Sequence, residues 1–353
     1  MKKIIWLAAA LTVLATACER YVDLKTEGPE SILVMNGNLC SGDTLHTVYL
    51  SLSQVRNVEP VKSAVLKCYV NGKLVSETDE VIERYGCGTV QFKADFGPGD
   101  EVKITVESGS CMAETVSTVP SLPGISIVDT CSVTLKDGNA LRAHLNIRDI
   151  KGEDNYYRLL AYVDSDFWAE EVAPDVTEYT EGQHLESCSE TKYIDNSEEG
   201  LLYRKIGTDK EQDMYDYYSN YYNIFTDSQF ADGDYTLALL MSESNLMNYY
   251  SGEWDGDCFT LTETRKLRFR ILSLSKQTYY YMNDYAFDHS DQSAWTFVSS
   301  IPYPSNVTGG TGMVSVMAPV DAEIGLDKIR YSGLDLNTDQ EGVLAPKVPR
   351  ECQ

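Results

Sequence analysis

The chain has 353 residues, of which 43% are hydrophobic and 24% are charged, and these values are typical of a folded globular protein. Acidic residues number 54 against 29 basic residues, which gives a formal net charge of −25 at pH 7. Such a surface repels phosphate backbones, so the composition argues against a nucleic-acid-binding protein. It also disfavours electrostatic docking on anionic lipid headgroups.

The first residues of the chain have the pattern of a bacterial lipoprotein signal. Lys2 and Lys3 precede the apolar run Ile4–Leu14, and small residues then lead to Cys18. An apolar run of eleven residues is too short for a helix to cross a bilayer, because a crossing needs roughly 20 residues. We therefore predict a signal peptide over residues 1–17 and a lipid on Cys18 after cleavage. The alternative is an ordinary secreted protein that is cut elsewhere.

A tether and a first β-domain are predicted next. Residues 18–30 are polar and lack hydrophobic periodicity, which indicates a lipidated tether. Short strand-like runs follow over residues 31–119, and Asn71-Gly72 predicts a two-residue hairpin turn between two of them. Short strands at this spacing predict an immunoglobulin-like β-sandwich over residues 31–119.

The segment Val119–Gly124 contains two prolines and a glycine and predicts a linker. Runs rich in β-branched and aromatic residues resume after it, so we assign residues 125–335 to a larger β-rich C-terminal domain. Residues 336–353 are predicted to be a polar tail. The expected fold class is therefore mostly β, with an immunoglobulin-like sandwich followed by a larger β-rich domain.

One or two helices are expected within the C-terminal domain. Aromatic residues recur every three or four positions over Thr208–Phe225, which favours an amphipathic helix. Ser275 has the character of a helix N-cap, and the helix that it caps would span Lys276–Asp288.

Eight cysteines remain when Cys18 is set aside. An even number of cysteines in an exported chain indicates disulfides, because the compartment outside the inner membrane is oxidising. The spacings contain no C-x-x-C, which disfavours a thiolate zinc site or a thioredoxin-like redox motif. The connectivity stays open at this point.

The sequence does not predict catalysis, a cofactor or a metal. The histidines are not in H-E-x-x-H spacing, and no G-x-S-x-G motif occurs. The acidic turns Asp232-Gly-Asp234 and Asp255-Gly-Asp257 offer carboxylates that calcium could use, but neither matches a twelve-residue calcium loop. Asp-Gly is common in turns, so we interpret both as turns. We expect a protein that is not an enzyme.

The aromatic clusters are the candidate ligand-binding residues. A tyrosine offers a large apolar face and one polar end, which suits stacking on sugars or binding along a peptide. The candidates are Tyr217, Tyr218, Tyr221, Tyr222 and Trp254. The alternative is that these rings only pack in the core and loops of the second domain.

Several stretches together resemble a known family. They are the lipobox, the strand start Asp154-Asn-Tyr-Tyr-Arg, the strand-to-helix unit Leu267–Tyr281, and the stretch Pro304–Val314. In this order they resemble the domain-of-unknown-function 4249 lipoproteins of Bacteroidota. The family has no established biochemistry. The resemblance implies an outer-membrane context, because such lipoproteins are often encoded near TonB-dependent transporters.

Two functional hypotheses follow. The first is a lipid-anchored cell-envelope binding protein, accessory to TonB-dependent nutrient uptake, with a glycan or peptide ligand and a TonB-dependent transporter as partner. It would be attached to the outer membrane through its N-terminal lipid, on either the cell-surface or the periplasmic face. The alternative is a structural or adhesive, fimbrillin-like surface lipoprotein, which needs an arm for strand exchange.

Overall fold

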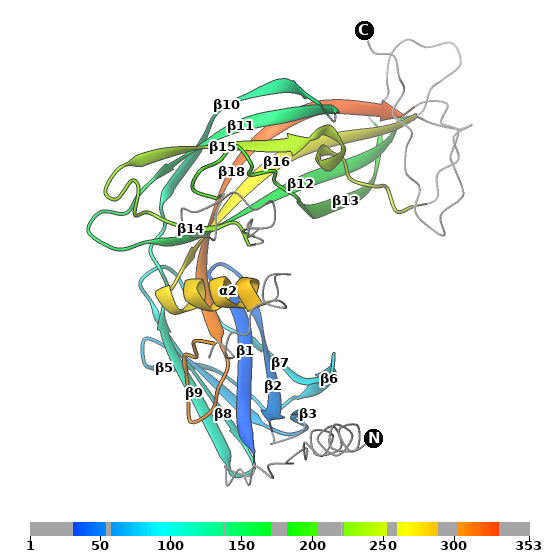
Figure 1. The fold of residues 1–353 in the computed structure, drawn as a ribbon. Helices are drawn as coiled ribbons and strands as arrows, with labels where there is room; N and C mark the ends of the chain where they lie inside the picture. The colour runs from blue at the N-terminus through cyan, green and yellow to red at the C-terminus, as the bar shows by residue number, and fades with distance from the viewer. Residues whose placement is uncertain are drawn as a thin grey trace, which may run out of the picture.

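The computed structural model describes residues 31–53, 58–136, 138–170, 182–202, 220, 222–252, 260–288 and 303–331. These residues form mainly β-strands, with one α-helix and one short 3-10 helix, so the mostly β fold class is confirmed (Figure 1). The strands make three sheets of ten, five and three strands. None of the helices in the described ranges is both long enough and apolar enough to cross a membrane.

The N-terminal half is a sandwich of two sheet regions. Its strands are β1 (Ile32–Cys40), β2 (Leu45–Ser53), β3 (Val58–Pro60), β4 (Val65–Val70), β5 (Lys73–Thr78), β6 (Ile82–Arg84), β7 (Cys87–Lys93), β8 (Glu101–Ser108) and β9 (Cys111–Thr118). Strands β1, β2 and β7 face β4, β8 and β9 across one apolar core, to which Met35, Leu50, Leu66 and Ile104 contribute fully buried side chains. In β1 and β4, buried residues alternate with less buried ones, as expected for strands of two packed sheets.

The Asn71-Gly72 turn predicted from the sequence is confirmed. Both residues have positive φ, 51° and 76°, and they connect β4 to β5 as an antiparallel hairpin. Glycine and asparagine adopt this left-handed conformation at the lowest cost, which is why the dipeptide predicts the turn.

The C-terminal half is a second pair of packed sheets. Its strands are β10 (Gly124–Leu135), β11 (Gly138–Arg148), β12 (Tyr156–Glu170), β13 (Gln183–Lys192), β14 (Ile224–Thr226), β15 (Asp234–Ser242), β16 (Thr260–Leu274) and most of β18 (Val314–Tyr331). The start of β18 and the short strand β17 (Val307–Thr308) lie in the first half instead. The sheet β10-β11-β15 packs on β12, β16 and β18, with Leu145, Leu159, Leu239 and Phe269 fully buried between them. The 3-10 helix η1 (Glu243–Leu246) follows β15.

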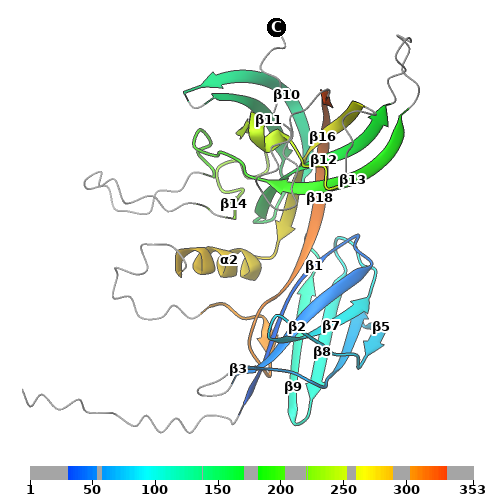
Figure 2. The ribbon, with the colours of Figure 1, turned by 90° about the vertical axis from the view of Figure 1, so that its right-hand side faces the viewer.

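Strand β18 belongs to both halves. From Gly37↔Val314 to Cys40↔Met317 it pairs in parallel with β1, and from Ala318 onward it pairs antiparallel with β16. The largest sheet therefore runs β13-β12-β16-β18-β1-β2-β7-β6 without interruption. Figure 2 shows β18 passing as one strand from the lower sandwich into the upper sheet.

The first sandwich is thus completed by residues from near the end of the chain. Val307, Val314 and Val316 are buried in its core, and β17 pairs with β9. The sequence-based division, with one domain over residues 31–119 and another over residues 125–335, places these residues in the wrong half. The pattern of residues within a strand does not show which strand will pair with it in parallel, more than two hundred residues away.

The helix α2 (Lys276–Asp288) has the predicted bounds. Its N-cap is also confirmed, because the backbone N–H of Thr278 donates to Ser275 Oγ at 3.1 Å. In Figure 1 the helix lies between the two halves, beside β1 and β18.

The second predicted helix, Thr208–Phe225, lies mostly outside the described residues. At its end the prediction is wrong, because Ile224–Thr226 forms β14 and pairs with β12. Asn223 has φ 49°, which no helix interior adopts, and the Asn220 side-chain amide bonds to both backbone groups of Ile224. These local hydrogen bonds compete with a helix at this point.

The cysteines in the described part of the chain carry free thiols, so the expected disulfides do not form among them. They are Cys40, Cys68, Cys87, Cys111, Cys131 and Cys188. Burial in the first core raises the pKa of the Cys68 thiol to about 11, which keeps it protonated and unreactive toward exchange. Cys258 and Cys352 lie outside the described residues.

Candidate functional site

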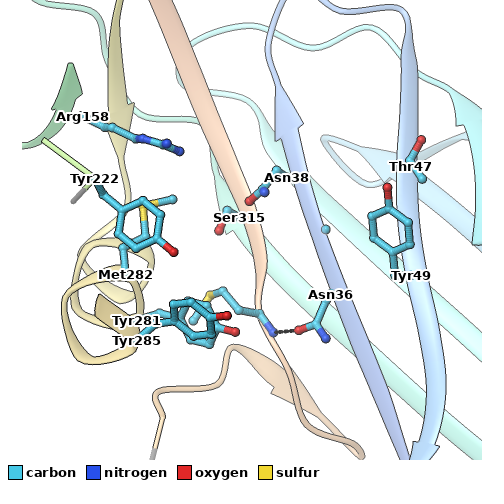
Figure 3. Close-up of a pocket in the computed structure, with 12 residues that line it drawn as sticks. Asn36, Asn38, Thr47, Tyr49, Arg158, Tyr222, Tyr281, Met282, Tyr285 and Ser315 are labelled. Atoms are coloured by element: carbon cyan, nitrogen blue, oxygen red, sulfur yellow. Dashed lines mark hydrogen bonds between the residues drawn. The ribbon is translucent and has the colours of Figure 1, made fainter. Parts of the chain in front are cut away.

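A cavity of about 500 Å³ lies between α2 and the outer face of the first sandwich (Figure 3). Its lining comes from six segments of the chain, at residues 36–38, 47–49, 158, 222, 281–285 and 313–315. The lining residues are Asn36, Gly37, Asn38, Thr47, Tyr49, Arg158, Tyr222, Tyr281, Met282, Tyr285, Met313 and Ser315. We call this cavity the tyrosine pocket. Its volume lies within the range of about 300–1,000 Å³ that is usual for small-molecule sites.

One wall of the pocket is a face of α2. Tyr281 and Tyr285 are four residues apart, so they lie on the same side of the helix, and their rings stack at 6.3 Å between centroids. Tyr303 packs against both rings, at 5.8 Å and 6.1 Å. On the adjacent face, Tyr279 and Met282 are buried in a separate apolar cluster that attaches the helix to β16 and β18. The helix therefore holds the two pocket tyrosines in place.

The opposite wall is the outer face of β1 and β2. Met35 and Leu39 of β1 point into the sandwich core, so Asn36 and Asn38 point outward into the pocket. Asn36 Oδ1 accepts the backbone N–H of Met313 at 2.9 Å, which orients its amide (Figure 3). Thr47 and Tyr49 of β2 extend this polar wall.

The third side of the pocket comes from the C-terminal half. Arg158 of β12 lies with its guanidinium carbon 5.2 Å from the centroid of the Tyr222 ring, a cation–π contact. Figure 3 shows both side chains opposite Asn38 and Ser315. The pocket therefore combines aromatic faces, amide and hydroxyl groups, and one guanidinium.

Burial affects the Tyr281 hydroxyl in this site. It raises the pKa of Tyr281, and the nearby Tyr285 raises it further. The hydroxyl therefore stays protonated at neutral pH and can donate a hydrogen bond to a ligand.

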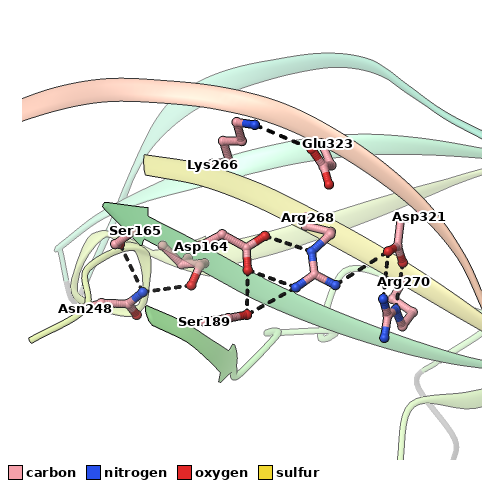
Figure 4. Close-up of polar contacts among 10 residues, drawn as sticks. Asp164, Ser165, Ser189, Asn248, Lys266, Arg268, Arg270, Asp321 and Glu323 are labelled. Atoms are coloured by element: carbon pink, nitrogen blue, oxygen red, sulfur yellow. Dashed lines mark hydrogen bonds and ion pairs between the residues drawn. The ribbon is translucent and has the colours of Figure 1, made fainter. Parts of the chain in front are cut away.

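Further along the sheet, Arg268 and Arg270 of β16 lie on the same side as Arg158, because their partners in register on β12, Tyr162 and Leu160, are an even number of residues from Arg158. Figure 4 shows the ion pairs that these two arginines make. Arg268 donates to both oxygens of Asp164 at 2.7 and 2.8 Å, and Arg270 does the same with Asp321. These fork-shaped pairs hold the pKa of Asp164 below its usual value. Their carboxylate partners are on neighbouring strands, so the pairs fasten β12, β16 and β18 together.

The structure places one of the predicted ligand-binding residues in the pocket. Tyr222 lines it, whereas Tyr217, Tyr218, Tyr221 and Trp254 lie outside the described residues. Cys18, the predicted lipidation site, also lies outside them.

The candidate residues chosen from the sequence do not include the rest of the lining. Tyr281 and Tyr285 carried a usable signal, since tyrosines four residues apart on a helix share a face. Asn36, Asn38 and Arg158 carried none, because ordinary alternation in a strand cannot show what lies opposite its outer face.

A serine, a histidine and an aspartate also meet on β12 and β13. His184 Nε2 lies 2.9 Å from Ser187 Oγ, and Ser187 Oγ donates to Asp166. In a catalytic triad the carboxylate instead orients the imidazole through its other nitrogen. The exposed cluster therefore has the residue types of a triad without its order of hydrogen bonds.

The acidic turn at Asp232–Asp234 has structural partners. Asp232 Oδ1 accepts the Gly152 N–H at 2.7 Å, and Asp234 pairs with Arg148 at 3.4 Å. Within the described residues, no group of three or more histidine, cysteine, aspartate or glutamate side chains is arranged to hold a metal ion. The second turn, at Asp255–Asp257, lies outside the described residues.

Comparisons with known proteins give little functional information. The comparison with curated proteins finds no match. Among solved structures, the chain is similar to a DUF4785 family protein from Legionella pneumophila subsp. pneumophila str. Philadelphia 1, with 10% sequence identity and a TM-score of 0.19. The match covers 67% of this chain and 51% of that one, so this chain spans about half the length of that protein.

A family model matches most of the chain. The matched region runs from residue 19 to residue 322 and includes both sandwiches, α2 and the first part of β18. The chain therefore belongs to the family described as "Domain of unknown function (DUF4249)".

Proposed function

We propose that this protein is a lipid-anchored binding protein of the bacterial cell envelope, which captures a glycan or peptide and passes it to a TonB-dependent outer-membrane transporter. The observation that carries the binding role is the tyrosine pocket. It presents the stacked pair Tyr281 and Tyr285 opposite the amides of Asn36 and Asn38. Aromatic faces opposite fixed polar groups are the usual composition of a binding site for a polar ligand with an apolar face.

The position of the pocket also supports this role. Its walls come from both halves of the chain, and the paired strands β1, β18 and β16 hold those halves together. A wall of packed strands and a capped helix needs little reorganisation on binding, which favours affinity. The lipid on Cys18 and the transporter partner rest on the N-terminal sequence pattern and on the family resemblance.

The structural or adhesive alternative has less support. It requires a sandwich that accepts a strand from another molecule. In the described residues, β1 is already paired on both edges, by β2 and by the chain's own β18. Polymers of the trimmed protein on native gels would favour this alternative over the binding role.

The test of the binding role compares two tyrosines of one helix. Tyr285→Ala removes a pocket wall, whereas Tyr280→Ala removes a partly exposed ring on α2 that does not line the pocket. On glycan and peptide arrays, we expect Tyr285→Ala to lose binding by roughly tenfold or more, since stacked aromatic rings are common binding hot spots. The Tyr280→Ala protein should bind as the wild type does. Equal binding by all three proteins would contradict the proposal.

The transporter partner needs a separate test. The native protein should co-purify with a large β-barrel transporter when membranes are dissolved in a gentle detergent. Its absence under those conditions would remove the uptake role and leave the binding role intact.

A further inference from the structure

Four exposed apolar side chains lie on one part of the first sandwich. They are Ile32 of β1, Val58 of β3, Ile82 of β6 and Tyr85 in the turn after β6, with exposed fractions of 39%, 67%, 39% and 93%. Single exposed apolar residues are normal on a protein surface, whereas several on one surface indicate a contact with a partner or a membrane. We call this group the apolar surface.

The strand register places Ile32 and Val58 on the same face of one sheet. Both residues pair with Ser53 of β2, from its two sides, and residues that are paired in register point to the same side of a sheet. Leu33, the next residue of β1, is buried in the sandwich core, so Ile32 points away from that core. Ile32 and Val58 therefore both lie on the outer face.

Ile82 belongs to the same outer face. It pairs with Thr89 of β7, and Thr89 in turn pairs with Tyr49 of β2. Tyr49 and Ser53 are four residues apart in β2, so their side chains share a face. Three strands that are distant in sequence thus present branched aliphatic side chains to the same side of the sandwich.

Tyr85 is the most exposed of the four residues and has an unusual backbone conformation. The turn Tyr85-Gly86 joins β6 to β7, and both residues have positive φ, 53° and 72°. Gly88 pairs with Leu50, so the turn that precedes it extends toward the Ser53 end of β2. Figure 1 shows β6 projecting from the sandwich near β3. An exposed aromatic ring at a strained position is not there for packing within the chain, and it points to an outside contact.

The chain enters the sandwich at this same place. The described residues begin at Ser31, directly before Ile32, and the proposed lipid would be attached at Cys18. An extended chain spans at most about 3.3–3.6 Å per residue, so Ser31 would lie within roughly 45 Å of that lipid. The apolar surface is therefore kept close to the membrane, where even a weak contact is formed for much of the time.

On this basis, and resting on the proposed lipid anchor, we infer that the apolar surface lies on the membrane that holds the lipid, so that the protein stands on it in one orientation. Tyrosine suits the level of the headgroups, because its ring is apolar and its hydroxyl is polar. The aliphatic side chains of Ile32 and Val58 fit the boundary between headgroups and acyl chains.

This contact does not depend on attraction between charges. The chain has a formal net charge of −25, which disfavours anionic headgroups. Glu59 and Glu83 directly follow Val58 and Ile82, so their carboxylates point to the other faces of β3 and β6. Arg84 is on the same side of β6 as Ile82, where its guanidinium can bind a lipid phosphate. A zwitterionic lipid is therefore the partner that this surface fits.

Two other occupants fit less well. A second copy of the chain would bring together two molecules that each carry a net charge of −25. A protein partner such as the proposed transporter has no fixed connection to this surface, whereas the membrane is connected to it through the residues between Cys18 and Ser31.

The experiment uses the full-length protein as cells process it, reconstituted in vesicles of phosphatidylcholine. Tyr85→Trp places a fluorescent ring in the turn, and Tyr193→Trp places the control ring at a tyrosine of the second half that is 71% exposed. Flotation shows whether the protein is on the vesicles. Lipids with bromine on their acyl chains then quench the tryptophans that lie close to them. The wild-type signal is subtracted, because the chain has four tryptophans of its own.

We expect brominated lipid to quench the added tryptophan at least about twofold more strongly at position 85 than at position 193, since an aromatic ring at the interface lies next to the acyl chains. Val58→Trp repeats the measurement on a second strand and should be quenched as Tyr85→Trp is. It also keeps the test decisive if a melting curve shows that Tyr85→Trp does not fold. Addition of anionic phosphatidylglycerol to the vesicles should not strengthen the quenching.

The outcomes separate the inference from the proposed anchor. Floating protein with equal quenching at positions 85 and 193, or with quenching only on anionic vesicles, would overturn the inference and leave the lipid anchor in place. A blue shift at position 85 without quenching would show that a protein, such as a second copy, covers the surface, and it would also overturn the inference. Protein that does not float with the vesicles would overturn both.

Discussion

The side chain of Asn306 and the backbone of Val314 are joined by two hydrogen bonds. The Val314 N–H donates to Asn306 Oδ1 at 3.0 Å, and Asn306 Nδ2 donates to the Val314 carbonyl at 2.7 Å. The Asn306 amide thus bonds to both backbone groups of the first residue of β18, as the backbone of a neighbouring strand would. These two hydrogen bonds fix the position at which β18 begins to pair with β1, beside the tyrosine pocket.

Replacing Asn306 by alanine should therefore destabilise the protein. Two partly buried backbone groups lose their partner, and at about 1 kcal/mol net for each hydrogen bond we expect a loss of about 2 kcal/mol. The measurement is the free energy of unfolding in urea. Asn139→Ala, at the exposed start of β11, is the control; it removes one exposed side-chain hydrogen bond, from Thr134, and should change the free energy by less than about 0.5 kcal/mol. Equal effects of the two substitutions would contradict this account of the start of β18.

Gly312 tests the close approach of the chain just before β18. Its φ is 115°, and a Cβ atom there would lie 2.3 Å from the carbonyl oxygen of Met35. Both the conformation and the contact exclude a side chain, so Gly312→Ala should cost about 1–3 kcal/mol or more. Gly325→Ala is the matched control within β18, since a Cβ there would meet nothing within 4 Å and no positive φ is required. The thermal unfolding midpoint should fall for the first substitution and stay near the wild-type value for the second.

The pair of Asp164 and Arg268 predicts a pH dependence. Hydrogen bonds from Arg268 lower the pKa of Asp164, so the folded protein binds this proton more weakly than the unfolded chain does. The stabilisation is therefore fully present above the unfolded carboxyl pKa of about 4, and it is lost as the pH falls through the lower folded value. The wild type should lose more of its urea midpoint between about pH 6 and pH 3 than Asp164→Asn does.

The control for this pH dependence is Asp79→Asn, at an exposed position of the first half. It should keep the wild-type dependence. If Asp164→Asn loses stability with falling pH as steeply as the wild type, the ion pair is not the source of the effect.

The proposed lipid anchor predicts a change of compartment. Cys18→Ala removes the thiol that the lipid would modify, so the protein should move to the soluble fraction or keep its signal peptide. Fractionation and the mass of the processed chain measure both results. A Cys18→Ala protein that is processed normally and stays in the membrane would refute the lipoprotein assignment.

Local sequence signals predicted the local structure. Asn71-Gly72 indicated its hairpin because few dipeptides accept two positive φ angles, and Ser275 indicated α2 because its hydroxyl caps the first turn. The error at Ile224–Thr226 has a different origin. There the hydrogen bonds of Asn220 and the pairing with β12 override a helical pattern of aromatic residues.

Long-range pairing could not be predicted in the same way. Gly37 and Val314 are neighbours only because the chain returns to its first strand after forming the whole second half. The pocket depends on this return, since Ser315 and Asn38 come together through it. The residues of a site assembled from such contacts do not occur at any regular spacing in the sequence, so a single sequence does not show that they come together. Tyr222 was found because aromatic residues cluster around it in sequence, not because its partners could be foreseen.

The parallel pairing of β1 and β18 has a mechanical consequence. If the chain is held at the membrane by its N-terminus and pulled by a partner at the far end of β18, the two strands are drawn in opposite directions along their length. Their hydrogen bonds, from Gly37↔Val314 to Cys40↔Met317, are then loaded together in shear and not one after another. A tethered protein with this pairing would resist a pulling force between two membrane components until all of these hydrogen bonds break together.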